Sequence, residues 1–242
     1  MIQPLPNGDA GRSLEDASAE PRRGSQTDAA YARLKDMIVS GEIDPADHVD
    51  AKTLADLLAL GRTPVREALL RLQTEGIVRI VPKRGVRIVT LSADDITEIY
   101  QVISAIEIEA VRILTLARPS SRDLDQLSDG CERMTVAAKI DDREAWILAD
   151  EAFHRTLLAL NPNRRLRDVG LLHRDLAQRA HFVALRLLDR DQLAKSARRH
   201  KKLVKLIVAG DVEAAVLEHH VQRERGQAML VGILTKYRLT HL

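Results

Sequence analysis

Aromatic residues and cysteines are scarce in this 242-residue chain. Phe, Trp and Tyr together make up 2% of the residues, so a core has to be built from Leu, Val, Ile and Ala. Those residues, at a hydrophobic fraction of 45%, are typical of packed helices in a soluble globular protein. The single cysteine, Cys131, has no partner for an internal disulfide or a Cys-based zinc cage, and we predict that it is a buried small hydrophobic side chain.

Long apolar runs are also lacking. No stretch approaches the roughly 20 apolar residues that span a bilayer, and the N-terminus has no apolar core of a signal peptide. We therefore predict a cytoplasmic protein without a membrane partner. Residues 1–27 are rich in Pro, Gly, Ser, Asp and Arg without apolar periodicity, which predicts a disordered tail. The rest of the chain is long enough for two domains.

Three helices are predicted after the tail. Apolar residues recur at helical spacing in DAAYARLKDMIVSGEI (28–43) and AKTLADLLAL (51–60), and the pattern resumes after GRT in PVREALLRLQTEG (64–76). Pro64 suits the first turn of the third helix, where its missing N–H costs nothing. Gly76 suits the position just past the end of that helix.

A β-hairpin follows these helices. Two β-branched runs, 77–81 and 86–90, flank the sequence PKRG, which predicts a hairpin with a cationic tip. A helix, a helix–turn–helix and a hairpin in this order are typical of a winged helix–turn–helix, a compact reader of DNA. We assign this domain to residues 28–91.

Positive charge is concentrated in residues 61–88. This segment holds seven cations against two anions, a net of +5, so the chain's total of +2 leaves −3 for the remainder. The third helix begins with Arg62, Thr63 and Arg66, whose offsets of one and four place them on one helical face. Because the N-terminal residues of a recognition helix meet base edges, we predict that this face reads DNA.

Long amphipathic segments dominate from residue 92 onward. Ser92 precedes two acidic residues at the start of LSADDITEIYQVISAIEIEAVRILTLA (91–117) and is a predicted N-cap. Further amphipathic segments continue to about residue 240. The second domain, residues 92–242, is therefore predicted to be an all-α helical bundle, which makes the fold class mainly α with one small β-hairpin wing.

A family resemblance enters at LADLLALGRTPVREALLRLQTEGIVRIVPKRGVRI (54–88), which closely resembles the DNA-binding domain of the GntR family of bacterial transcriptional regulators. The segments DEAFHRTLLALNPN (150–163) and RRHKKLVKLIVAGDVEAA (198–215) resemble the helical effector domain of the FadR branch, called the FCD domain. The resemblance implies a ligand-responsive regulator, a repressor rather than an enzyme. It also implies that a homodimer binds an inverted-repeat operator in double-stranded DNA.

The resemblance also implies which residues contact DNA. Arginine is the common bidentate partner of guanine, so Arg62 and Arg66 are expected to read bases. Lys83, Arg84 and Arg87 are expected to meet phosphate or the minor groove. Gly61 replaces a Ser that usually caps the recognition helix in the family, at a cost of a few tenths of a kcal/mol. The matching contact positions are Lys52, Arg62, Thr63, Arg66, Lys83, Arg84 and Gly85.

A histidine and carboxylate pattern suggests a metal site. Asp150 and His154 are four residues apart, so both side chains leave one face of a helix. In the resembling domain this pair and two histidines on later helices hold a divalent metal at the floor of the effector pocket, and His200 matches the third ligand. Mixed His and carboxylate ligation suits Zn²⁺, Ni²⁺ or Mn²⁺.

The fourth ligand is less clear. The family spacing puts it at Gln222, whereas this chain offers His219 one helical turn earlier and His220 beside it. We prefer His219, because His220 would need a local shift of the helix to face the pocket. Two more histidines, His173 and His181, lie eight residues apart and therefore nearly on one face, where they either line the pocket or are exposed.

The expected effector is a small organic acid, the class that many members of this branch sense. The family often has an Arg where this chain has Ile103, so another cation would have to bind the carboxylate of the effector. The candidates are Arg112, Arg179 and Arg223.

Two other functions compete with a ligand-responsive regulator. A metal-dependent enzyme fused to a DNA-binding module could use Asp150, His154 and His200, but the sequence has no HExxH motif, Gly-rich phosphate loop or nucleophile context. An architectural DNA protein would bind without regard to sequence, and the sizeable second domain argues against it.

Overall fold

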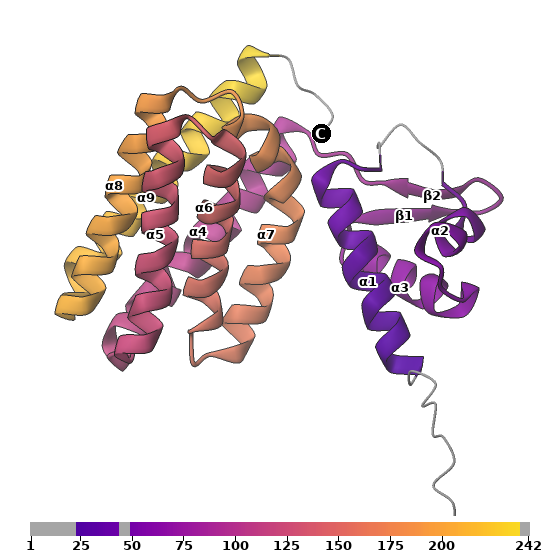
Figure 1. Ribbon diagram of the computed structural model, residues 1–242, viewed down its shortest axis with the longest axis horizontal. Coiled ribbons are helices and arrows are strands. Elements are labelled where there is room, and N and C mark those ends of the chain that lie inside the picture. Colours follow the sequence, from indigo (N-terminus) through magenta and orange to yellow (C-terminus); the bar gives the residue numbers. More distant parts are fainter. Residues whose placement is uncertain (1–22, 44–48, 238–242) are drawn as a thin grey trace, which may run out of the picture.

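The computed structural model describes residues 23–43 and 49–237, without the side chains of residues 23–25, 179, 183 and 184. Figure 1 shows a small N-terminal part of helices and a hairpin beside a larger helical bundle. The N-terminal elements are α1 (Arg23–Ser40), α2 (Ala51–Leu58), α3 (Arg62–Thr74), β1 (Val78–Val81) and β2 (Gly85–Ile88). The bundle consists of α4 (Ala93–Ala117), α5 (Ser121–Ile140), α6 (Arg143–Ala159), α7 (Arg164–Leu185), α8 (Arg190–Ala209) and α9 (Val212–Lys236).

The start of α1 corrects the predicted end of the tail. The helix begins at Arg23, so the last residues of the predicted tail 1–27 are helical. Of these residues, Thr27 contacts α3, because its Oγ1 donates a hydrogen bond of 2.8 Å to Glu67. Residues 1–22 lie outside the described part of the chain.

Aliphatic side chains form the core of the N-terminal domain, as their periodicity predicts. Leu34 of α1 packs with Leu69 and Leu72 of α3, and all three are at most 2% exposed. Val86 and Ile88 of β2 close the other side of this core. The predicted winged helix–turn–helix is therefore confirmed, with α3 as the second helix of the motif and the hairpin as the wing.

The wing is a two-stranded antiparallel hairpin. Its register pairs Val78 with Ile88 and Val81 with Gly85, so the strands are slightly shorter than the predicted runs. Val49 extends the sheet, because its amide and carbonyl each form a backbone hydrogen bond with Val86, of 3.2 and 2.9 Å. This bridge ties the wing to the residues just before α2.

The helical bundle is built on capped amphipathic helices. The predicted cap at Ser92 is confirmed: its hydroxyl accepts from the amide of Asp95, while the Asp95 carboxylate accepts from the amide of Ser92. The core holds Trp146 and Phe153 of α6 and the buried Cys131 of α5, as predicted for that cysteine. Burial raises the pKa of the Cys131 thiol to about 12, so the side chain stays a neutral thiol. None of the described helices is both long and apolar enough to cross a membrane.

Gly85 has a structural role in the wing. Its φ is +87°, a left-handed conformation that favours glycine. An added Cβ would lie 2.8 Å from the carbonyl oxygen of Val49, which already accepts the amide of Val86. Gly85 thus lets the backbone of the wing approach the backbone at Val49 closely, a structural role that is separate from the predicted contact with DNA.

We predict opposite effects of the same Gly→Ser substitution at two positions of this domain. Gly85→Ser is expected to destabilise the domain by about 1–3 kcal/mol, because it adds backbone strain and a clash with a backbone oxygen. Gly61→Ser is the matched control, since Gly61 is an N-cap with φ −63° and ψ 152° and no side-chain cap. It is expected to stabilise by a few tenths of a kcal/mol. Denaturant unfolding measures both, and equal stabilities would contradict the structural role of Gly85.

Candidate DNA-reading surface and effector pocket

Helix α3 presents the side chains that the sequence assigned to DNA. Val65 and Leu69 on its inner face are buried, while Arg62, Thr63 and Arg66 are exposed. Within the described ranges, neither Arg62 nor Arg66 forms an ion pair, so both guanidiniums are available to an anionic partner. The side of the helix that faces solvent is therefore the cationic side.

Arg71, further along α3, is engaged within the domain. Its guanidinium lies 3.7 Å from the centre of the Tyr31 ring and 3.4 Å from a carboxylate oxygen of Glu75. The side chain of Arg71 is still 51% exposed, so these contacts join α1 to the end of α3 at the surface of the domain.

The wing adds further cations. Lys83 and Arg84 form the turn between the strands, and Lys83 adopts a left-handed φ of 64°. The register pairs Arg79 with Arg87 across the strands, and both are exposed. Lys52 is exposed in the first turn of α2. In Figure 1 the wing tip and α2 lie on the side of the N-terminal domain that faces away from the bundle.

The bundle contains a pocket of about 280 Å³ formed by α6, α7, α8 and α9. Buried polar groups line one part of it, namely Asp150, His200, Gln222 and Arg223. Trp146, Leu185, Leu188 and Met229 supply apolar walls. Further cations, among them Lys195, Arg199 and Arg225, also line the pocket. A small ligand with an anionic end and an apolar body matches this lining.

Three of the predicted metal ligands converge. His154 Nε2 lies 3.3 Å from His200 Nε2 and 3.9 Å from Asp150 Oδ1, and His200 Nε2 lies 3.4 Å from the same oxygen. A tetrahedral ion with bonds of ~2.1 Å separates its ligands by about 3.4 Å, so the spacing fits such an ion. The positions follow from α6, where Asp150 and His154 lie in the same inward stripe as Trp146.

Neighbouring groups orient both histidines as ligands. His200 Nδ1 donates 2.9 Å to the carbonyl of Ser196, which leaves the lone pair on Nε2 facing Asp150. His154 Nδ1 lies 3.1 Å from Glu107 Oε2 but forms no hydrogen bond among the described residues, and its Nε2 is the nitrogen that faces the group. A carboxylate behind a ligating histidine is the usual outer-shell support of a metal site.

Burial keeps the two histidines of this group in the protonation state that a metal needs. Burial lowers the pKa of His154 well below its ordinary value and lowers the pKa of His200 to about 4, so both imidazoles are neutral at pH 7. Burial also raises the pKa of Asp150, against the opposing effect of His181 and two arginines. A divalent cation would favour the ionised form of this carboxylate and offset the cost of its burial.

The structure does not bring His219 into this group. His219 Nε2 lies 3.2 Å from Glu107 Oε2, and the residue forms a separate cluster with Glu107 and His154. Helix α9 turns His219 toward α4 and turns position 222 toward the pocket, which Gln222 lines. The Nε2 atom of Gln222 is buried without a hydrogen-bond partner among the described residues. His220 is exposed, 3.3 Å from Glu224. The family position, Gln222, and not His219, thus lines the pocket together with Asp150 and His200.

The three arginines that were predicted to bind the effector lie in different places. Arg223 lines the pocket and lies 3.3 Å from His154 Nε2. Arg112 does not line it, because it is exposed on α4 and binds Glu109 at 2.6 Å, and we no longer assign it an effector role. The side chain of Arg179 lies outside the described residues. His181 lines the pocket, 3.8 Å from Asp150.

Glu107 is the group that our sequence analysis missed. It is fully buried on α4 and lies 2.7 Å from Arg174 and 3.2 Å from Arg223. Burial alone would raise its pKa, but His154 and the two guanidiniums outweigh that effect and hold the pKa well below its ordinary value. The sequence did carry a signal, since this acidic residue lies at helical spacing from Ile103 within an apolar stripe.

Comparison with known proteins now identifies the family. Residues 26–88 match the family model described as "Bacterial regulatory proteins, gntR family", and residues 98–223 match the model of the FCD domain. The chain belongs to the GntR family. These are transcriptional regulators, so the protein is a DNA-binding regulator and not an enzyme.

Individual relatives agree with this assignment. An uncharacterized HTH-type transcriptional regulator in the TAR-I ttuE-ttuC' intergenic region of Agrobacterium vitis is 39% identical over 133 residues, 54% of this chain and 78% of that protein. The HTH-type transcriptional repressor GlaR of Escherichia coli is 27% identical over 192 residues, 76% of this chain and 86% of GlaR. The solved structure of E. coli McbR/YncC has the same fold, with a TM-score of 0.75 at 21% identity over 88% of this chain and 98% of that one.

We predict that the bundle depends on Glu107. Glu107→Gln is expected to reduce the free energy of unfolding by about 3 kcal/mol or more, because it leaves buried guanidiniums without their carboxylate. Glu109→Gln on the same helix is the control and should change stability little, since Glu109 and its partner Arg112 are exposed.

The effect of Glu107→Gln should depend on pH in a defined direction. The carboxylate has a lowered pKa in the folded state, so its contribution is fully present above the ordinary value of 4.5 and is lost as the pH falls through the folded pKa. Urea unfolding between pH 3 and pH 7 measures the difference. A Glu107→Gln defect that stays the same size across this range would contradict the ionised state of Glu107.

Proposed function

We propose that this GntR-family regulator is a repressor that binds an inverted-repeat operator as a homodimer, and that a small carboxylate bound at a divalent metal in the bundle controls this binding. The observation that supports the effector site best is the convergence of two neutral histidines and Asp150 beside Arg223 in a pocket of about 280 Å³. The repressor role is supported by the name of GlaR, which is a transcriptional repressor.

The reading of DNA is assigned to α3 and the wing. The exposed Arg62 and Arg66 would contact base edges in the major groove, with Thr63 between them. Lys52, Lys83 and Arg84 would contact phosphates or the minor groove and add affinity with little sequence information. A dimer would place its two recognition helices one helical turn of DNA apart, about 34 Å, or at another phase-matched distance.

The metal would be held by Asp150, His154 and His200, with Gln222 beside them. Zn²⁺, Ni²⁺ and Mn²⁺ all suit this mixture of imidazole and carboxylate. The ion would supply a Lewis-acidic position for an oxygen of the effector. Arg223 Nη2 lies 3.3 Å from His154 Nε2, so a cation and the guanidinium would repel each other unless an anion lay between them. A carboxylate effector offsets that repulsion, which is the physical reason for this class of ligand.

For the DNA-reading surface, we predict that Arg62→Ala or Arg66→Ala weakens specific operator binding at least about tenfold, because each removes a bidentate base contact. An operator selected from random-sequence DNA and measured by fluorescence anisotropy provides the test. Arg33→Ala is the control, because it removes the same charge from an exposed residue of α1 that pairs with Glu42. If all three variants lose the same affinity, the arginines of α3 act through charge alone and do not read bases.

For the metal site, we predict that the purified protein binds one Zn²⁺ per chain and that His200→Ala loses this binding. His220→Ala should keep it, since His220 is an exposed histidine of α9 beside Glu224. Calorimetric titration of metal-free protein measures the stoichiometry, and native mass spectrometry of the protein as purified identifies a retained organic acid. Equal Zn²⁺ binding by the two variants would rule out the proposed ligand set.

A further inference from the structure

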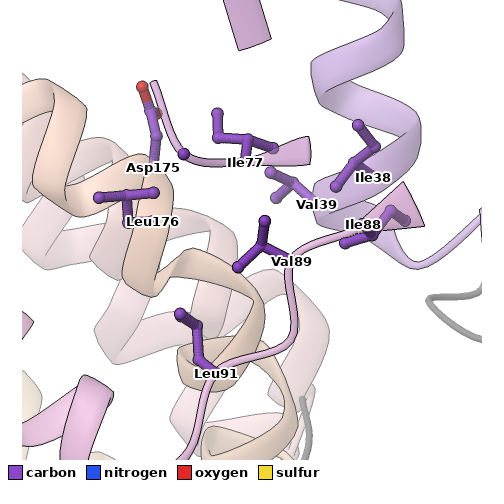
Figure 2. A pocket seen from close by; sticks show the side chains of 9 residues that line it. Ile38, Val39, Ile77, Ile88, Val89, Leu91, Asp175 and Leu176 are labelled. Atoms are coloured by element: carbon purple, nitrogen blue, oxygen red, sulfur yellow. The ribbon is translucent and has the colours of Figure 1, made fainter. Parts of the chain in front are cut away.

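Helix α7 joins the bundle to the DNA-reading domain. Asp175 is 8% exposed and forms short ion pairs with Lys35 of α1 and Arg155 of α6. The next residue, Leu176, packs against the core of the N-terminal domain. Figure 2 shows both residues beside Ile77 and Val89 at a small cavity of about 30 Å³ between the two parts.

The contact continues from Lys35 to the recognition helix. Lys35 Nζ donates 2.8 Å to the Tyr31 hydroxyl, which in turn donates 2.7 Å to a carboxylate oxygen of Glu75. Glu75 is the C-cap of α3. Among the described residues, Lys35–Asp175 is the ion pair that crosses from one domain to the other. The end of α3 is therefore tied to α7 through Lys35.

In the other direction, charged groups of alternating sign lead from Asp175 to the pocket. Arg155 Nε lies 2.7 Å from Glu151, and Glu151 accepts from Arg174 Nε at 3.2 Å. Arg174 Nη1 lies 2.7 Å from Glu107, whose other oxygen lies 3.2 Å from Arg223 Nη1. Glu151, Arg174, Glu107 and Arg223 are all at least 92% buried, so water screens these pairs weakly.

We propose that Asp175 is the positioning residue through which the effector pocket controls the orientation of the recognition helix. The inference rests on the proposed function of that pocket. An anion that binds Arg223 competes with Glu107 for the guanidinium, and Glu107 can then turn toward Arg174. Each change in one pair alters the partner available to the next, because every group from Glu107 to Asp175 has two partners of opposite charge. Asp175 passes this change to Lys35 and so to the C-cap of α3.

A double-mutant cycle on the full-length protein tests this coupling without a ligand. The variants are Asp175→Asn, Arg223→Met and the double variant, and the readout is hydrogen exchange of residues 34–40 in α1 and 71–77 at the end of α3. Asp175→Asn is expected to accelerate exchange about tenfold, because it removes charge-assisted contacts. Arg223→Met should also accelerate it, and the double variant should be no faster than Asp175→Asn alone.

Two further variants serve as controls. Asp168→Asn makes the same substitution two turns earlier on α7, where the side chain is exposed and pairs with Arg167, and it should leave both segments unchanged. Arg155→Met interrupts the contacts at a residue outside the pocket. It should accelerate exchange as Arg223→Met does, and so it tests the coupling even if Arg223→Met also disturbs the bundle. The proposal would be overturned if the exchange rate in the double variant rose by the product of the two single effects. It would also be overturned if neither Arg223→Met nor Arg155→Met changed the exchange rate.

The proposed function is judged separately. Zn²⁺ titration of Asp175→Asn reports on the pocket, because Asp175 is not among the residues that line it, and binding of one Zn²⁺ per chain, as proposed for the wild type, is expected. Loss of metal binding in the wild type would contradict the metal site without bearing on the exchange cycle. Additive exchange with normal Zn²⁺ binding would contradict the coupling alone.

Discussion

The effector domain depends on a carboxylate that is completely withdrawn from water. Glu107 lies on α4 within contact of groups from α6, α7 and α9, so one side chain joins four helices. Burying a charge costs several kcal/mol unless it is paired and hydrogen-bonded. Arg174 and Arg223 provide that pairing at 2.7 and 3.2 Å, and the bundle cannot change the relative positions of these helices without disturbing it.

The chemistry of the pocket follows from the same burial. Imidazoles withdrawn from water do not take up a second proton, so His154 and His200 are neutral and the lone pairs of their Nε2 atoms face each other and Asp150. Lone pairs that face one another in this way repel until a cation or a hydrogen atom lies between them. Arg223 Nη2 lies 3.3 Å from His154 Nε2, so a guanidinium and the lone pairs of the histidines meet at the same part of the pocket.

In the DNA-reading domain the charged groups of interest are exposed, whereas those of the pocket are buried. The core of this domain is small and aliphatic, and the arginines on α3 that we propose to read DNA are exposed rather than buried. An exposed guanidinium stays hydrated, so it has almost no desolvation cost and can contact phosphate or guanine. The orientation of the helix that carries it is set by the packing of that helix. That packing includes α1 and, through Lys35 and Asp175, helix α7 of the bundle.

Local patterns in the sequence were enough to determine the winged helix–turn–helix, the exposed face of α3, the cap at Ser92 and the pair formed by Asp150 and His154. Each of these depends on spacing along one segment, and helical or strand geometry converts spacing into direction. The tertiary structure alone decided that position 222 of α9 and not His219 faces the pocket, and that Arg112 stays on the surface. It alone placed Glu107 and Asp175 between helices far apart in sequence. These outcomes depend on how each helix is rotated against its neighbours, and that rotation is set by the packing of the whole core.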